Sequence, residues 1–334
     1  MRNKRLTIAS AALGTLLLAT GCSAGGDDTA DDNKQTTQAE QTSAADQPLE
    51  LPDKHLQKND EGKSVKALQE KLQRIGYDIA LSGTYDALTI WAVTDYQMQQ
   101  DNLDVTGVYN DRTQEAMQAY KDNVKAIKPG RKLDKPSDED TAISNPHEIL
   151  ALVNKDHVLP DGFKPLNLVE PDVQFPFDES LPKKQMRQAA ATALEDMFQA
   201  ANEEDLELFA QSGYRSFDRQ DAIFASNVRE SGEEAANQFS AKPGESEHQT
   251  GLTMDVTSSE VNFKLVEDFG DTAEGKWLKK NAADYGFIIR YPKGKQAITG
   301  YQYEPWHLRY VGEEAATAIM EQELTLEEYL GKAD

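Results

Sequence analysis

Two short polar segments in the second half of the chain carry residue types that bind catalytic metals. Residues 246–255 contain His248 and Asp255, and residues 304–309 contain His307. Catalytic zinc is held by three nitrogen or oxygen ligands, with a fourth position open to water. The carboxylate of Asp255 lies in an otherwise apolar run, where it is costly unless it is paired or bound to a metal. The sequence therefore predicts a zinc ion held by His248, Asp255 and His307.

Glu304 lies three residues before His307 and is the candidate general base. In an extended segment, side chains three residues apart point to opposite faces of a sheet. Pro305 cannot donate a ladder hydrogen bond, so it interrupts regular pairing and lets Glu304 turn into the site. A carboxylate beside metal-activated water can take its proton and return it to a leaving amine. A lone histidine is more often a hydrogen-bonded structural residue, but the combination indicates a hydrolytic site.

The elements that would position these residues alternate between helices and strands after about residue 145. The spacing of apolar residues predicts four helices, at 184–202, 219–230, 277–285 and 313–322. It also predicts four strands, at 208–213, 252–257, 286–290 and 306–310. The expected fold of residues 146–330 is therefore α+β, with a small mixed or antiparallel sheet and flanking helices.

Residues 58–121 show a separate, helical pattern. Apolar residues recur at helical spacing in three short stretches, and residues 83–86 and 107–110 both read Gly-x-Tyr-Asp/Asn. Each of these loops is followed by a threonine, so the sequence contains a weak repeat of loop and helix. We expect a small three-helix module, joined to the second domain by a polar linker at 122–145.

The first 22 residues read as the signal peptide of a lipoprotein. A basic start is followed by an apolar run at 6–19, which is short for a membrane span. Residues 19–22 read Ala-Thr-Gly-Cys, small residues before a cysteine as in a bacterial lipobox. An ordinary secretory signal with an incidental Cys22 is the alternative. Cys22 is the only cysteine of the chain, so a disulfide within the chain is excluded and a lipid anchor is favoured.

Such an anchor would place the protein on the extracytoplasmic face of the cell membrane. Residues 23–57 are rich in small and polar residues and are expected to form a flexible linker. The formal net charge of -23 repels phosphate backbones and anionic headgroups. We therefore expect no nucleic-acid partner, and contact with the membrane through the lipid anchor only.

The three-helix pattern resembles the peptidoglycan-binding module of cell-wall hydrolases. The second domain resembles the VanY-type D-alanyl-D-alanine carboxypeptidases, a group that includes D,D-dipeptidases and L,D-carboxypeptidases. The family pattern joins an early Tyr-Arg-Ser to Ser-x-His-x-x-Gly-x-Ala-x-Asp and a later Glu-x-x-His. This chain carries these residues in that order: Tyr214, Arg215, Ser216, Ser246, His248, Gly251, Asp255, Glu304 and His307. Thr253 stands where the family has Ala, which is expected to alter packing slightly and to leave zinc binding intact.

This resemblance implies a function and roles for further residues. Arg215 would stabilise the oxyanion or hold the scissile carbonyl, and Gln220 and Ser246 would bind the terminal residue of the substrate. The protein would be a zinc D,D-carboxypeptidase that removes the C-terminal D-Ala from peptidoglycan stem peptides, with its module on the glycan. Two alternatives stay open: an L,D-carboxypeptidase acting on tetrapeptide stems, and a wall-binding lipoprotein without catalysis. The complete set of ligands and base argues against the second.

Overall fold

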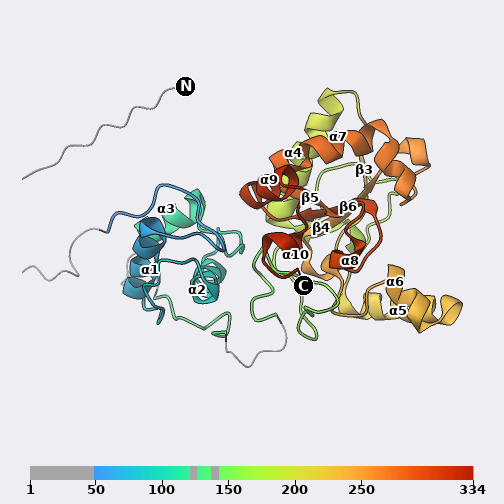
Figure 1. The fold of residues 1–334 in the computed structure, drawn as a ribbon. Helices are drawn as coiled ribbons and strands as arrows, with labels where there is room; N and C mark the ends of the chain where they lie inside the picture. Colours follow the sequence, from blue (N-terminus) through green and yellow to red (C-terminus); the bar gives the residue numbers. More distant parts are fainter. Residues whose placement is uncertain (1–48, 121–125, 137–142, 334) are drawn as a thin grey trace, which may run out of the picture. The chain divides into compact units, whose positions relative to one another are not determined.

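A computed structural model describes residues 49–120, 126–136 and 143–333 (Figure 1). The expected signal peptide at 1–22, the lipidation site Cys22 and most of the expected linker at 23–57 lie outside these residues. Among the helices that the structure describes, none has the length and apolar character needed to cross a membrane.

The N-terminal module consists of three helices around one apolar core. Their bounds are α1 Lys63–Ile75, α2 Ala87–Met98 and α3 Asp111–Ala119. Asp86 caps α2 by accepting a hydrogen bond from the Thr89 amide, and Asn110 caps α3 in the same way, through Thr113. These caps explain why the chain changes from loop to helix at the same point of each repeat.

The repeat is also visible in two buried glutamines. The Oε1 atom of Gln69 accepts a hydrogen bond of 2.9 Å from the Gly83 amide, and that of Gln97 accepts one of 2.9 Å from the Gly107 amide. Both glycines adopt positive φ, +76° and +73°, which side-chain-bearing residues rarely do. Each loop is therefore fixed to the preceding helix by the same contact.

The ordered module extends beyond the predicted limits of 58–121. Leu51 and Leu56 are buried in its core, and Leu56 pairs with Tyr109 in an antiparallel bridge. On the other side, Ile127 is buried, and the Trp91 indole donates a 2.8 Å hydrogen bond to the Leu133 carbonyl. Residues 49–57 and 126–136, which the sequence assigned to the linkers 23–57 and 122–145, thus contribute side chains to the core of the module.

The C-terminal domain is built on a four-stranded antiparallel sheet with the order β3-β4-β6-β5. The strands are β3 Phe209–Ser212, β4 Thr253–Thr257, β5 Phe287–Tyr291 and β6 Glu304–Tyr310. A second, two-stranded antiparallel sheet is formed by β1 Leu168–Val169 and β2 Met186–Arg187. The prediction of an α+β domain with a small antiparallel sheet is confirmed.

Three helices lie on one face of this sheet (Figure 1). Each of them contributes apolar side chains to the core. They are α4 Gln188–Glu203, α7 Ala273–Asn281 and α9 Glu313–Glu321. The remaining helices are α5 Phe217–Ser231, α6 Glu233–Phe239, α8 Gln296–Thr299 and α10 Leu326–Tyr329. The predicted helix at 184–202 begins only at Gln188, because Pro182–Lys184 forms a separate 3-10 turn and β2 intervenes. The predicted helix at 277–285 likewise ends at Asn281 and continues as the 3-10 turn Ala282–Tyr285.

Strand alternation decides which side chains of β4 leave the core. Met254 and Val256 are fully buried members of the apolar core. Successive side chains of a strand point to opposite faces, so Asp255 between them projects to the other face of the sheet. The site described next lies on that face.

Candidate metal centre

Two histidines and one aspartate converge at the centre of the sheet. One ligand atom from each of His248, Asp255 and His307 lies within 4.8 Å of the other two. The Nε2 atom of His248 is 3.3 Å from one oxygen of Asp255, and the Nδ1 atom of His307 is 3.3 Å from the other. All three side chains are buried. The structure therefore brings together the three residues that the sequence assigned to zinc.

The register of the sheet explains the meeting of Asp255 and His307. They are direct cross-strand partners in the antiparallel pairing of β4 with β6. Such partners have Cβ atoms about 5 Å apart on the same face. The two ligands are thus placed by the most rigid part of the domain.

A tight turn returns His248 to the same place. His248 lies in the 3-10 turn Glu247–Thr250, which ends at Gly251 with φ of +69°. This conformation favours glycine, and a Cβ atom at this position would also lie 2.9 Å from the Leu168 side chain. The Nδ1 atom of His248 then donates a 2.8 Å hydrogen bond to the Gly213 carbonyl, which leaves Nε2 to face Asp255.

Glu304 reaches the cluster because β6 is irregular at its start. Ile289 pairs with Leu308 but Tyr291 pairs with Glu304, so β6 has two residues more than β5 over this stretch. This bulge brings Glu304 and His307 to one side, with the Glu304 carboxylate 3.5 Å from the His307 Nδ1 atom. The prediction that regular pairing fails near Pro305 is confirmed.

The pKa of Glu304 is shifted in the opposite direction from that of the predicted ligand Asp255. Burial, supported by the charge of Asp255, raises the pKa of Glu304 to about 7. A carboxylate with a pKa near neutral pH both accepts and returns a proton readily. The pKa of Asp255 stays below its usual value despite burial, because the positive charges of His307 and Arg215 favour its ionised form.

The two imidazoles differ in charge in the absence of metal. Burial lowers the pKa of His248 to about 3, so its ring is neutral and its Nε2 lone pair is free to bind a metal. Burial opposes a charge on His307 as well, but the adjacent carboxylates of Asp255 and Glu247 raise its pKa to about 9. A metal ion entering the site would displace that proton.

The donor set fits a zinc ion. Two imidazole nitrogens and one carboxylate are the ligand types that catalytic zinc prefers. The Oδ1 atom of Asp255 is buried and has no hydrogen-bond partner in the described structure, although it faces the histidines. A buried carboxylate oxygen without a partner is unfavourable, and a cation between the three side chains would satisfy it.

The substrate residues implied by the resemblance line the same cavity. A cavity of about 250 Å³ is bordered by Arg215, Gln220 and Ser246 together with the three ligands and Glu304. Arg215 donates a 2.9 Å hydrogen bond to the Gln220 side chain, whose amide group donates a 2.6 Å hydrogen bond to the Ala241 carbonyl. Burial lowers the pKa of Arg215, while the charges of Asp255 and Glu304 oppose this shift. Every residue assigned to catalysis, metal or substrate thus faces one space.

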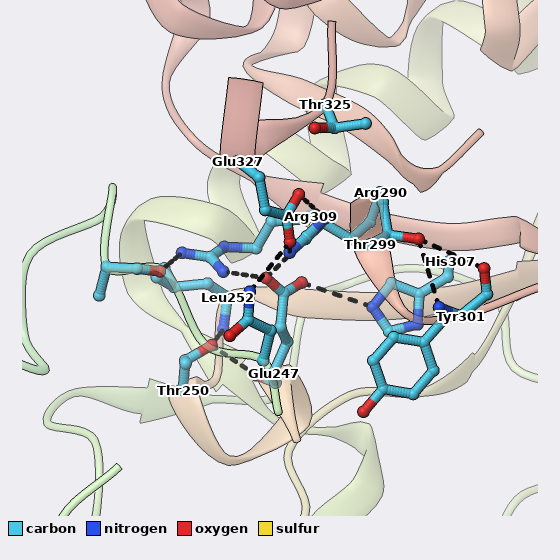
Figure 2. Close-up of polar contacts among 12 residues, drawn as sticks. Glu247, Thr250, Leu252, Arg290, Thr299, Tyr301, His307, Arg309, Thr325 and Glu327 are labelled. Carbon is cyan, nitrogen blue, oxygen red and sulfur yellow. Dashed lines mark hydrogen bonds and ion pairs between the residues drawn. The ribbon is translucent and has the colours of Figure 1, made fainter. Parts of the chain in front are cut away.

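Sequence reasoning missed a cluster of four buried charges behind His307. Glu247, Arg290, Arg309 and Glu327 are joined by ion pairs, and Figure 2 shows the Glu247 carboxylate pointing toward the His307 ring. The arginines pull the pKa of Glu247 far below its usual value despite its burial. The available signal was the presence of arginine inside the two apolar strands β5 and β6.

Comparison with known proteins gives two family matches. Residues 183–313 match the VanY family, described as D-alanyl-D-alanine carboxypeptidase. Residues 61–117 match a putative peptidoglycan binding domain. The second match covers the three-helix module, and the first covers the strands and turns that carry the metal site.

Individual relatives agree with these matches. The chain is 57% identical over 190 residues to a putative carboxypeptidase YodJ of Bacillus subtilis, covering 57% of this chain and 70% of that protein. It is 37% identical over 187 residues to the bifunctional D-Ala-D-Ala dipeptidase and carboxypeptidase VanXYC of Enterococcus gallinarum, covering 54% of this chain and 92% of that protein. The solved structure of the LdcB LD-carboxypeptidase is 55% identical, with a TM-score of 0.57, and covers 60% of this chain and 94% of that chain.

Proposed function

Because this chain belongs to the VanY family of carboxypeptidases, we propose that it is a zinc-dependent enzyme that removes the C-terminal D-Ala from peptidoglycan stem peptides. The observation that carries this proposal is the convergence of His248, Asp255 and His307 with Glu304 in one cavity. The domain that precedes the catalytic domain supports a wall substrate, since it matches a putative peptidoglycan binding domain. That module would keep the enzyme on glycan, which raises its local concentration near stem peptides.

Four residues that line the cavity have roles in the proposed reaction beside the metal ligands. Zinc, when bound, would polarise the scissile carbonyl and acidify the attacking water. Glu304 takes the proton of that water and later delivers it to the leaving amine nitrogen. Arg215, a partly buried cation, stabilises the negative charge that develops on the carbonyl oxygen. Gln220 and Ser246 hold the terminal residue of the substrate.

The bond that is cut has two candidates, and both release D-Ala. A D,D-carboxypeptidase acts on pentapeptide stems and agrees with the family description. An L,D-carboxypeptidase acts on tetrapeptide stems. This alternative is favoured by the 55% sequence identity to the LdcB LD-carboxypeptidase. The cavity residues serve either bond, because the metal, the base and the carboxylate site are common to both.

Defined stem peptides test the proposal and separate the two bonds. The zinc-loaded protein is incubated with tripeptide, tetrapeptide and pentapeptide stems, and the products are identified by mass spectrometry. We expect loss of one alanine, with conversion of tetrapeptide to tripeptide as the faster reaction. Faster conversion of pentapeptide would assign the D,D specificity. Release of alanine from neither stem would contradict the proposed function.

Recognition of the terminal carboxylate gives a second prediction. A carboxypeptidase binds the free C-terminus through charge-assisted hydrogen bonds, for which Arg215, Gln220 and Ser246 are the candidates. An amide at the C-terminus of the stem peptide should therefore lower kcat/KM by about tenfold or more, the size expected for lost hydrogen bonds to a charged group. Equal cleavage of the amide and the acid would point to an endopeptidase.

We also propose that Cys22 is lipidated and fixes the protein to the outer face of the cytoplasmic membrane. The support is the sequence of residues 1–22, which ends in small residues before the only cysteine of the chain. A Cys22→Ser variant should appear in the medium or the soluble fraction, whereas Ser43→Ala, in the same part of the chain, should stay with the membrane. Fractionation followed by immunoblotting measures this, and a Cys22→Ser variant that remains in the membrane fraction would refute the anchor.

A further inference from the structure

The two metal-binding imidazoles use different ring nitrogens. His248 faces Asp255 with Nε2, and its Nδ1 atom is held by the Gly213 carbonyl at 2.8 Å. His307 faces Asp255 with Nδ1 at 3.3 Å, so its Nε2 atom points away from the ligand cluster. The ring nitrogen that a ligating histidine does not offer to the metal normally donates to a carboxylate, carbonyl or water, which fixes the ring. His307 therefore needs an acceptor behind it.

Glu247 occupies the position of that acceptor. Its Oε2 atom lies 3.6 Å from the His307 Nε2 atom, and both atoms are buried without another hydrogen-bond partner in the part of the chain that the structure describes. The separation exceeds a normal hydrogen bond by about half an ångström. A small rotation of the His307 ring would close this gap, and the resulting hydrogen bond would satisfy two buried polar atoms at once.

The Glu247 carboxylate is itself held rigidly. Its Oε1 atom accepts hydrogen bonds from Arg290 Nε at 2.8 Å and from Arg309 Nη1 at 2.6 Å (Figure 2). These arginines lie on β5 and β6, the strands beside the metal site. Because both arginines bind Oε1, the Oε2 atom of Glu247 is left to face His307. The two guanidinium groups also fix the orientation of the carboxylate.

The cluster is neutral as a whole. A second carboxylate, Glu327 from α10, accepts two hydrogen bonds from Arg290, of 3.0 and 2.6 Å. The remaining Nη2 donor of Arg309 is satisfied by the carbonyls of Ile149 and Ala151, at 2.9 and 2.8 Å. The charges of the two arginines are balanced by those of the two glutamates, so the buried cluster has no net charge.

We infer that Glu247 is a positioning residue for the metal site, whose carboxylate accepts the Nε2 proton of His307 and holds the ring so that Nδ1 binds zinc. This inference rests on the proposed function, because it concerns the zinc that the family fold implies. It assigns to the residue between Ser246 and His248 a task distinct from those of its neighbours.

The test is the zinc dissociation constant of the full chain, measured by competition with a chromophoric chelator. Glu247→Gln keeps the shape of the side chain and removes its charge, and should weaken zinc binding by about 10- to 100-fold, the range for residues that support metal ligands. Glu327→Gln is the matched control, because it removes the same charge from the same cluster without facing His307. Its zinc affinity should stay near that of the parent.

The outcomes distinguish this inference from the proposed function. A parent protein that binds no zinc overturns both. A parent that binds zinc, with Glu247→Gln binding it equally well, overturns only the role of Glu247. Equal losses in Glu247→Gln and Glu327→Gln also overturn it, since they would reflect general disruption of the cluster.

A measurement on the parent protein keeps the inference testable if Glu247→Gln does not fold. The chain has five histidines, so ¹⁵N-histidine labelling gives a simple spectrum. In the zinc-loaded protein the two metal-bound rings should be opposite tautomers, one protonated at Nδ1 and the other at Nε2. The Nε2 proton should exchange slowly with solvent. Two metal-bound rings that are both protonated at Nδ1 would contradict the inference.

Discussion

Replacing Glu304 with glutamine is expected to lower kcat for the preferred stem peptide by about 10²-fold or more, the usual scale for loss of a general acid-base group. The amide has the shape of the carboxylate but cannot take a proton from the attacking water. Glu304 is not one of the three clustered ligands, and it lies beside them with its carboxylate 3.5 Å from His307. Zinc content and fold should therefore be unchanged, as elemental analysis and circular dichroism can establish.

The matched control for this variant is Glu260→Gln, which makes the same change at an exposed glutamate outside the cavity. It should leave turnover unchanged. Near-parental turnover in Glu304→Gln would remove Glu304 from the mechanism. Loss of zinc in that variant would make Glu304 a ligand and not a base.

The His307→Ala variant is expected to lose both bound zinc and activity. It removes one of three ligands, and three are the usual minimum for catalytic zinc. It also leaves the carboxylates of Asp255 and Glu247 buried without the imidazole between them. Removing one partner of a buried charged pair costs on the order of 3 kcal/mol, so the free energy of unfolding should fall as well.

The appropriate control is a histidine outside the site, and His55→Ala serves because that side chain is exposed in the module. His55→Ala should bind one zinc ion per chain with parental activity. The chelated parent protein separates loss of metal from loss of fold, because it should be as inactive as His307→Ala but more stable. Stoichiometric zinc in His307→Ala would refute the ligand assignment.

The sequence was sufficient to predict the α+β fold of the second domain, and the residues it assigned to the site lie around one cavity. Strand periodicity placed β4 and β6 within two residues of their observed limits. The prediction of Asp255 as a ligand depended on one physical signal, a carboxylate within an apolar strand. The same signal was present at Arg290 and Arg309, which we assigned no function, because their partners lie far away in the sequence. Glu247 and Glu327 become visible as partners only when the sheet and α10 are folded.

The module limits were missed for a related reason. Residues 49–57 have no helical or strand periodicity, and Leu56 is buried through a single bridge to Tyr109. The composition of a segment predicts whether it can form its own core, but not whether it adds to a core built by others. The same holds for Ile127 and Leu133, which follow the last helix of the module.

The order of residues in the buried charge cluster has a consequence for biosynthesis. A chain made from its N-terminus presents Glu247 first, Arg290 and Arg309 next, and Glu327 last. Until Glu327 has emerged, two guanidinium groups share one carboxylate, and burying them leaves a positive charge without a partner. The charge balance of the cluster is therefore completed only when Glu327 of α10 has been added. The buried charges behind His307 thus reach neutrality late in synthesis, when nearly the whole domain has left the ribosome.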